Sequence, residues 1–362
     1  MLSLLARFLR AAPEAQNRIL GLLEPRLQPL DTTSAVQQHP LVTRALSARD
    51  YFLIQGPPGT GKTSTVLMEL ARALDAQGLN VMIIAFTNQA IHIICEKLQK
   101  LGIEFIQLGR QDTPYSWKTL SEQHPLNKLY EEAARTRIFV STQATFANSL
   151  ELLEFKKFHT LIVDEASQLL EPQLAGILPK FERFILIGDD NQLPAVVLQD
   201  ETISRCRRPQ LAEIGLRNLR DSLFTRLLQN ARARGWDHCY GMLTKHYRMH
   251  ADIADYPNRH FYGGLLQPAL PDQQAPVAWP PSAHPLHTYF QQRVAYIRTQ
   301  PDPRSKINDE EAELVVELIR YVHQLYGAQF NPAATVGVIT PFRAQIANIR
   351  QKLPTEYQDV TI

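Results

Sequence analysis

The stretch Gly-Pro-Pro-Gly-Thr-Gly-Lys-Thr at residues 56–63 has the residue types and spacing of a phosphate-binding loop. Its glycines let the backbone turn tightly and point several N–H groups at phosphate oxygens. A helical stretch follows, so the positive end of its dipole adds to the attraction. Lys62 would reach the β- and γ-phosphates of a nucleotide, and the Thr63 hydroxyl would bind Mg²⁺. The residues predicted to bind the nucleotide here are Gly56, Pro57, Pro58, Gly59, Thr60, Gly61, Lys62, Thr63 and Ser64.

An acidic pair, Asp164-Glu165, ends the apolar stretch TLIVD at 160–164. Catalytic groups of open parallel sheets lie at the carboxyl ends of strands. Asp164 is therefore predicted to bind Mg²⁺, and Glu165 to orient and deprotonate an attacking water. An isolated acidic pair is usually only solvated, and the phosphate loop upstream is what favours the catalytic interpretation.

Two further stretches carry groups that suit a phosphate. Gly-Asp-Asp-Asn-Gln-Leu-Pro at 188–194 follows the apolar stretch RFILI, and the amide of Gln192 can donate to phosphate or to water. The alternative is a polar turn, for which these residue types are also suited. Tyr247 and Arg248 lie in the stretch LTKHYRMH at 243–250. Tyr247 offers a flat face for a base, and Arg248 would act as an arginine finger on the transferred phosphate.

The elements that must position these residues alternate between strand and helix. Unbroken apolar runs separated by helices predict an α/β fold with a parallel sheet covered on both faces. Helical periodicity runs over 63–74 and 90–100, and the polar stretch 111–136 is predicted to be a small helical insertion. The predicted strands are 51–55, 81–86, 103–108, 137–141, 160–164 and 183–187.

The pattern changes after residue 200. A basic amphipathic helix is predicted over 211–234, and the proline-rich stretch 271–304 is predicted to be mostly loop. A capping box at Asn308 opens a helix that runs to Tyr326. A strand at 335–339, a helix at 342–353 and a strand start at 359–362 would then begin a second α/β domain. We therefore expect an N-terminal helical segment at 1–48, an ATP-binding domain at 49–240 and a partial second domain at 241–362.

Composition excludes several classes of protein. The chain has 362 residues, of which 44% are hydrophobic and 20% charged, and a net charge of +2. These values are typical of a globular protein of roughly two domains. Three distant cysteines form no disulfide framework, which favours a reducing, cytoplasmic compartment. No run of about 18 apolar residues predicts a membrane helix. The N-terminus is either a transit peptide or a surface helix that ends at Pro13.

Together, these four motifs resemble those of superfamily 1 helicases. The sequences DEASQ, GDxxQLP and YRMH are similar to the 1B subgroup of the nonsense-mediated-decay RNA helicase and related DNA helicases and helicase-nucleases. The resemblance covers residues 35–362 and implies a P-loop NTPase in which two RecA-like domains clamp ATP and Mg²⁺. It also implies single-stranded DNA or RNA as the partner, with no membrane involved.

The resemblance assigns further residues by position. Gln38 matches the glutamine that reads adenine. Three short hydroxyl-containing stretches match motifs that hold the backbone of the single strand, and outside this register such residues would be caps and turns. The matched residues are Thr87, Asn88, Ser141, Thr142, Thr340, Pro341 and Arg343. Arginines at 205, 207, 208, 217 and 220 form either a phosphate-attracting patch or an ordinary solvated surface.

The expected function is an ATP-dependent helicase or translocase. The family has two more motifs after the second-domain strand, and one of them supplies a second arginine finger. They do not occur in these 362 residues. The alternatives are therefore a nucleotide-binding module, half of a split helicase whose remaining motifs lie on another chain or domain, or a misfolded or degraded truncation product. The sequence also departs from common family residues at Asn191 and His246.

Overall fold

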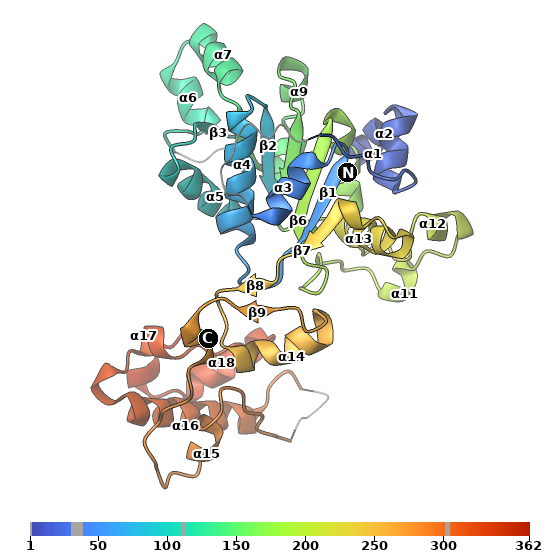
Figure 1. Cartoon of the computed structure of the whole chain (residues 1–362). Coiled ribbons are helices and arrows are strands. Elements are labelled where there is room, and N and C mark those ends of the chain that lie inside the picture. The colour runs from blue at the N-terminus through green and yellow to red at the C-terminus, as the bar shows by residue number, and fades with distance from the viewer. Residues whose placement is uncertain (1, 30–38, 110–112, 301–304) are drawn as a thin grey trace. The chain divides into compact units, whose positions relative to one another are not determined.

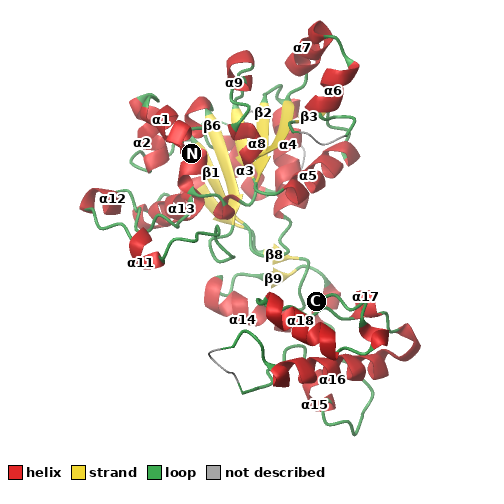
Figure 2. Ribbon diagram, turned by 180° about the vertical axis from the view of Figure 1, so that it is seen from behind, coloured by secondary structure: helices red, strands yellow, loops and turns green. Residues whose placement is uncertain are grey.

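The apolar stretches of the chain form one sheet of seven parallel strands (Figure 2). The fold is that of a computed structural model, which describes residues 2–29, 39–109, 113–300 and 305–362. The strand order across the sheet is β3-β4-β2-β5-β6-β1-β7. The strands are β1 (Tyr51–Gln55), β2 (Val81–Ala85), β3 (Phe105–Gln107), β4 (Ile138–Thr142), β5 (Thr160–Val163), β6 (Arg183–Gly188) and β7 (Tyr240–Met242). The predicted parallel sheet is thus confirmed, and β7 was missed because it is only three residues long.

Helices cover both faces of this sheet, and further helices form much of the later part of the chain (Figure 1). They are α1 (Leu2–Leu9), α2 (Pro13–Leu20), α3 (Pro40–Ser47), α4 (Leu67–Ala76), α5 (Asn88–Lys100), α6 (Trp117–Gln123), α7 (Leu126–Arg135), α8 (Gln143–Ala147), α9 (Leu152–Phe155), α10 (Glu171–Ala175), α11 (Glu201–Ser204), α12 (Pro209–Glu213), α13 (Leu223–Arg234), α14 (Ala251–Phe261), α15 (His287–Phe290), α16 (Asp309–Tyr326), α17 (Pro332–Thr335) and α18 (Arg343–Lys352). A π-helical turn, η1 (Lys62–Val66), precedes α4. Short 3₁₀ turns are η2 (Ala166–Gln168), η3 (Leu178–Lys180), η4 (Asp237–Cys239), η5 (Pro271–Gln274), η6 (Gly327–Gln329) and η7 (Thr355–Tyr357), and two short strands, β8 (Lys245–His246) and β9 (Gln267–Pro268), pair with each other.

The sheet is buried on both faces because alternate residues of each strand enter two separate cores. In β1, Tyr51 and Leu53 pack with residues of α13, whereas Phe52 and Ile54 pack with α3, α4 and α5. All five residues of β1 are buried. Strands that are covered on both sides need apolar residues at every position, and this explains the unbroken apolar runs in the sequence.

The N-terminal helices belong to the same compact unit as the sheet. Leu4 of α1 and Ile19 of α2 are buried in the core on the α13 side. This unit, here called unit 1, comprises residues 1–249 and 257–270, and unit 2 comprises 250–256 and 271–362. The boundaries at residues 48 and 240 stay predictions from the sequence. No helix among the described residues is both long and apolar enough to cross a membrane.

The helix predicted over 211–234 is wrong as a continuous element. The structure has α12 at Pro209–Glu213 and α13 at Leu223–Arg234, with Gly215 between them at φ +74°. A Cβ on Gly215 would lie 2.1 Å from the amide oxygen of Asn230, so the chain passes too close to α13 to continue as a helix. Ser222 then caps α13 by accepting a hydrogen bond from the Thr225 N–H.

Unit 2 is built on α16 and α18, which confirms both helices predicted there. Asn308 caps α16 by accepting from the Glu311 N–H at 3.1 Å. The core of the unit comprises Ala312, Val316, Ile319, Ile349, Leu353, Tyr357 and Val360. The strand predicted at 335–339 is wrong, because only Gly337 pairs, in an isolated parallel bridge with Thr361. Ile339 is 99% exposed, so the apolar run is not covered as an inner strand must be.

Candidate nucleotide site

The carboxyl edge of the sheet gathers the motif residues of unit 1. The glycine-rich loop follows β1, the acidic pair follows β5, and the loop with Gln192 follows β6; these strands are adjacent in the order β5-β6-β1. Because the strands are parallel, their carboxyl ends meet at one edge. A cavity of about 680 Å³ lies there, lined by Pro57, Pro58, Gly59, Thr60, Gly61, Lys62, Thr63, Ser64, Thr65, Ile93, Lys97, Glu165, Gln192, Tyr247 and Arg248.

The glycine-rich loop is tied to the sheet at one end and to a helix at the other. The Gly56 N–H donates to the Gly188 carbonyl at 2.8 Å, and the Thr60 hydroxyl donates to the Pro57 carbonyl at 2.7 Å. A Cβ on Gly56 would lie 2.1 Å from Cγ of Lys62, so the lysine stem lies directly over the loop backbone. The loop thereby places Lys62 at the start of a helical turn, as phosphate binding requires.

The Thr63 hydroxyl and the carboxylates of Asp164 and Glu165 lie close to Lys62. The Thr63 hydroxyl donates to Oδ2 of Asp164 at 2.7 Å. Nζ of Lys62 lies 3.5 Å from Oε1 of Glu165. Asp164 is 1% exposed, and burial raises its pKa to about 6, although the Thr63 hydrogen bond opposes this shift. The hydroxyl and carboxylate are the hard oxygen ligands that Mg²⁺ prefers.

Glu165 has a backbone conformation that is rare for its residue type. Its φ is +50°, in the left-handed region, and it is the one non-glycine residue with positive φ in the described part of the chain. Such conformations cost about 1–3 kcal/mol and concentrate at functional sites. The strained turn directs the backbone away from β5 at the residue whose side chain lines the cavity.

The loop after β6 is held by a buried polar network. Nε2 of Gln192 donates to Oδ2 of Asp189 at 2.7 Å. Asp190 accepts from Gln55 at 2.7 Å and lies 3.3 Å from Nη1 of Arg232. Burial raises the pKa of Asp190, and the Arg232 charge opposes this shift. These contacts connect the loop to β1 and α13, so Gln192 projects from a fixed base.

Tyr247 and Arg248 lie against the glycine-rich loop within unit 1. The Tyr247 N–H donates to the Gly59 carbonyl at 2.8 Å. The Tyr247 side chain lines the cavity and is 54% exposed. Arg248 packs closely on the loop, because a Cβ added to Gly59 would lie 2.4 Å from the Cβ of Arg248. The sequence had assigned both residues to the domain at 241–362, whereas unit 1 extends to residue 249.

Gly59→Ala is expected to destabilise the protein and displace Arg248. Gly59 has φ +74°, where an L-residue costs about 1–2 kcal/mol. The new Cβ would also collide with Arg248. Gly78→Ala is a matched control, because Gly78 has φ +72° but no atom within 4 Å of a Cβ. Denaturant unfolding should show a larger loss of unfolding free energy for Gly59→Ala than for Gly78→Ala. Equal losses would contradict the close contact between Gly59 and Arg248.

Sequence reasoning missed three cavity residues: Thr65 of η1, and Ile93 and Lys97 of α5. Lys97 is half-buried; burial lowers its pKa, and the nearby Asp164 charge opposes this effect. Ile93 and Lys97 belong to no motif, whereas Thr65 directly follows the phosphate-loop residues 56–64. The available signal was positional, since a helix that begins directly after β2 must pack beside α4 and its phosphate loop.

None of the other predicted nucleic-acid residues described in unit 1 lines the nucleotide cavity. Gln38 lies outside the described residues. Thr87 and Asn88 are exposed after β2, whereas Ser141 is fully buried and donates to the Thr142 carbonyl. Thr87 and Thr142 cap α5 and α8 with their hydroxyls. The residues Thr340, Pro341 and Arg343 belong to unit 2, and Arg343 is exposed.

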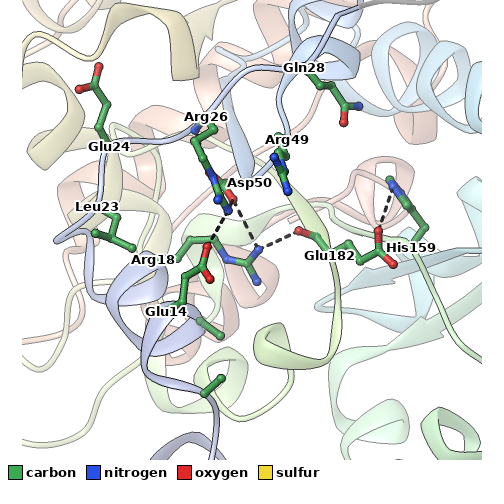
Figure 3. Close-up of a pocket in the computed structure, with 12 residues that line it drawn as sticks. Glu14, Arg18, Leu23, Glu24, Arg26, Gln28, Arg49, Asp50, His159 and Glu182 are labelled. Carbon is green, nitrogen blue, oxygen red and sulfur yellow. Dashed lines mark hydrogen bonds and ion pairs between the residues drawn. The ribbon is translucent and has the colours of Figure 1, made fainter.

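A second cavity, of about 640 Å³, lies at the opposite, amino edge of the sheet (Figure 3). Asp50, His159 and Glu182 come from the residues just before β1, β5 and β6. Arg26 lies 2.7 Å from Asp50, and Arg18 donates to the Glu182 carbonyl at 2.7 Å. These charged groups already bind one another, and none of the predicted site residues lies here.

Comparison with known proteins finds similar sequences over most of the chain. Two family profiles, each described as an AAA domain, match residues 33–200 and 219–362. The DNA replication ATP-dependent helicase/nuclease DNA2 of Gallus gallus is 32% identical over 262 residues, which cover 70% of this chain and 24% of that protein. The Homo sapiens protein of the same name is 34% identical over 238 residues, covering 64% of this chain and 21% of its own length. The chain thus spans about a quarter of these relatives.

A plant protein and a solved viral structure are also similar to parts of this chain. The helicase/nuclease JHS1 of Arabidopsis thaliana is 28% identical over 335 residues, which cover 88% of this chain and 23% of that protein. Among solved structures, the arterivirus nonstructural protein 10 (helicase) with DNA has a TM-score of 0.37 and 18% identity, covering 63% of this chain and 42% of its own.

Proposed function

Since this chain belongs to the superfamily 1 helicases of the DNA2-like type, we propose that it hydrolyses ATP to move along single-stranded DNA or RNA. The observation that carries the proposal is the single cavity that gathers Lys62, Glu165, Gln192 and Arg248. Four groups with these chemistries around one phosphate loop match the requirements of phosphoryl transfer, in which positioning and charge stabilisation dominate.

Lys62 and Glu165 have linked roles in this proposal. In the structure the two charges lie 3.5 Å apart. An arriving β,γ-phosphate would attract the Lys62 ammonium, and the Glu165 carboxylate would then be released to accept a proton from the attacking water. The resting ion pair keeps the base occupied until a nucleotide is bound.

Thr63 and Asp164 are the residues proposed to hold Mg²⁺. Their oxygens already lie 2.7 Å apart at the end of β5. The ion would neutralise charge between the β- and γ-phosphates. Asp164 must be ionised for this, and a nearby cation favours the ionised form despite burial.

Gln192 and Arg248 would act on the γ-phosphate, and Tyr247 would contact the nucleotide base. Gln192 can donate to a phosphate oxygen, and the Arg248 guanidinium would stabilise charge that develops during transfer. Gln38 would read adenine. The backbone N–H groups of the glycine-rich loop would hold the phosphates of the nucleotide.

Nucleic acid would bind the exposed motif residues after β2 and in unit 2. Thr87 and Asn88 lie at a helix N-terminus, where backbone N–H groups suit a phosphate. The Ser141 side chain is buried, so Ser141 and Thr142 would contribute mainly through backbone. Thr340, Pro341 and Arg343 supply the corresponding contacts from unit 2. Names of relatives that refer to DNA support a nucleic-acid partner.

The test is steady-state ATP hydrolysis by the 362-residue chain, alone and with single-stranded DNA or RNA. We expect turnover that the strand stimulates, and the two strand types distinguish the DNA and RNA forms of the proposal by their 2′-hydroxyl. ATP binding without turnover in any condition would instead favour a nucleotide-binding module or one half of a split helicase.

A further inference from the structure

We propose that Tyr262 is a positioning residue for ATP hydrolysis, which acts through Asp189 to fix the orientation of the Gln192 amide. The inference rests on the proposed function, because it assigns Gln192 to the γ-phosphate. Tyr262 lies in no motif that the sequence analysis used. It follows α14, far along the chain from Gln192, and the tertiary structure brings the two together.

Tyr262 and Gln192 are linked because both donate a hydrogen bond to the same oxygen of Asp189. Oδ2 of Asp189 accepts a hydrogen bond from the Tyr262 hydroxyl at 2.8 Å and from Nε2 of Gln192 at 2.7 Å. The Asn191 N–H donates to the other oxygen, Oδ1, at 3.2 Å. Asp189 is fully buried, and Tyr262 is 5% exposed. A buried carboxylate is stable only when such donors satisfy it, so each donor restricts where the carboxylate can lie.

This arrangement determines which end of the Gln192 amide faces the cavity. A carboxylate accepts and does not donate, so Nε2 must face Asp189. This hydrogen bond also sets the directions of the second N–H and of the carbonyl oxygen Oε1. The Gln192 side chain lines the nucleotide cavity. An amide flipped by 180° would place Oε1 against the Asp189 carboxylate, where two acceptors repel each other.

The Tyr262 hydroxyl is a dependable donor. Burial raises its pKa, and the hydrogen bond to Asp189 and the negative charge of that residue raise it further. The hydroxyl therefore stays protonated at neutral pH and keeps donating. A phenylalanine would fill the same space but would leave Asp189 with one donor fewer on Oδ2.

The segment around Tyr262 also connects to the strand that leads to Arg248. Nδ2 of Asn191 donates to the Phe261 carbonyl at 3.1 Å, which is a second link to the Gln192 loop. Further along, the Gln267 N–H donates to the Thr244 carbonyl at 2.8 Å in the β8–β9 pair. β8 leads directly into Tyr247 and Arg248. One segment of unit 1 thus braces the two residues proposed to act on the γ-phosphate.

Tyr262→Phe tests the hydroxyl alone. We expect kcat for ATP hydrolysis to fall about tenfold, the effect of losing one hydrogen bond to a charged group, while the KM for ATP changes little. Tyr296→Phe is the matched control, because Tyr296 is 85% exposed, and it should leave kcat unchanged. An unchanged kcat in Tyr262→Phe would overturn the proposal, and so would a rise in KM that accounts for the whole effect.

A double-mutant cycle tests whether Tyr262 acts through Gln192. In a Gln192→Ala background the amide is gone, so adding Tyr262→Phe should lower kcat no further. If the two losses multiply instead, Tyr262 acts by another route and the assignment fails. Thermal unfolding of each variant identifies any general loss of folding.

Hydrogen exchange supplies a readout that needs no turnover. The backbone amide of Asn191 donates to Asp189, so it should exchange faster in Tyr262→Phe than in the parent chain or in Tyr296→Phe. Equal exchange in all three proteins would overturn the contact. Absence of ATP hydrolysis in the parent chain would defeat the proposed function instead, so the two failures are distinguishable.

Discussion

Glu165→Gln is expected to lower ATP turnover by about 10²–10⁴-fold while leaving nucleotide binding intact. Glutamine keeps the size and hydrogen-bonding reach of the side chain but cannot take a proton from water. Its amide also no longer forms the ion pair with Lys62, which lies 3.5 Å from the native carboxylate. Lys62 is then free for phosphate, so affinity for ATP should be equal or higher.

The measurement is kcat together with an equilibrium titration of ATP. Glu131→Gln is a suitable control, because Glu131 is exposed on α7 and should leave both quantities unchanged. Turnover retained in Glu165→Gln would show that another group acts as the base. Lost binding would show instead that Glu165 supports the structure of the site.

Lys62→Ala is expected to weaken ATP binding by about 10- to 100-fold, the range for one hydrogen bond to a charged group. The Lys62 stem lies over Gly56 at the base of the loop, so the ammonium is directed by close packing. Alanine removes the charge and leaves Glu165 facing incoming phosphates without its partner. Repulsion between Glu165 and ATP would add to the loss.

A titration with ATP and Mg²⁺ measures this effect, and Lys128→Ala, at an exposed lysine of α7, is the control. The variant Lys62→Ala/Glu165→Gln separates the two contributions, since it removes the repulsion and should recover part of the lost affinity. ATP affinity equal to that of the parent chain in Lys62→Ala would contradict the assignment of the phosphate loop.

Local sequence was sufficient for six of the seven strands of the sheet and for most of the groups that line the nucleotide cavity. Each inner strand is a short apolar run because both of its faces are buried, and this produces a pattern that a single sequence reveals. The phosphate loop, the acidic pair and Gln192 follow such runs directly. Parallel pairing then brings their side chains to one edge without further information.

Sequence reasoning was weaker wherever a distant contact decided the outcome. The helix expected over 211–234 is interrupted at Gly215, where Asn230 of α13 occupies the space that a side chain would need. The strand expected at 335–339 has the right composition but pairs only through Gly337. Propensity describes a segment, whereas a strand also needs a partner along its length.

The sequence by itself therefore determined the parallel sheet and the chemistry offered at its carboxyl edge, because strand burial and loop composition are local properties. Only the tertiary structure revealed that Tyr262 shares a carboxylate oxygen with Gln192 and that Lys97 enters the cavity. These contacts join segments far apart in the chain, and no periodicity records them. Their physical cause is the need of buried polar groups for partners, which the fold satisfies with whichever donor it brings within reach.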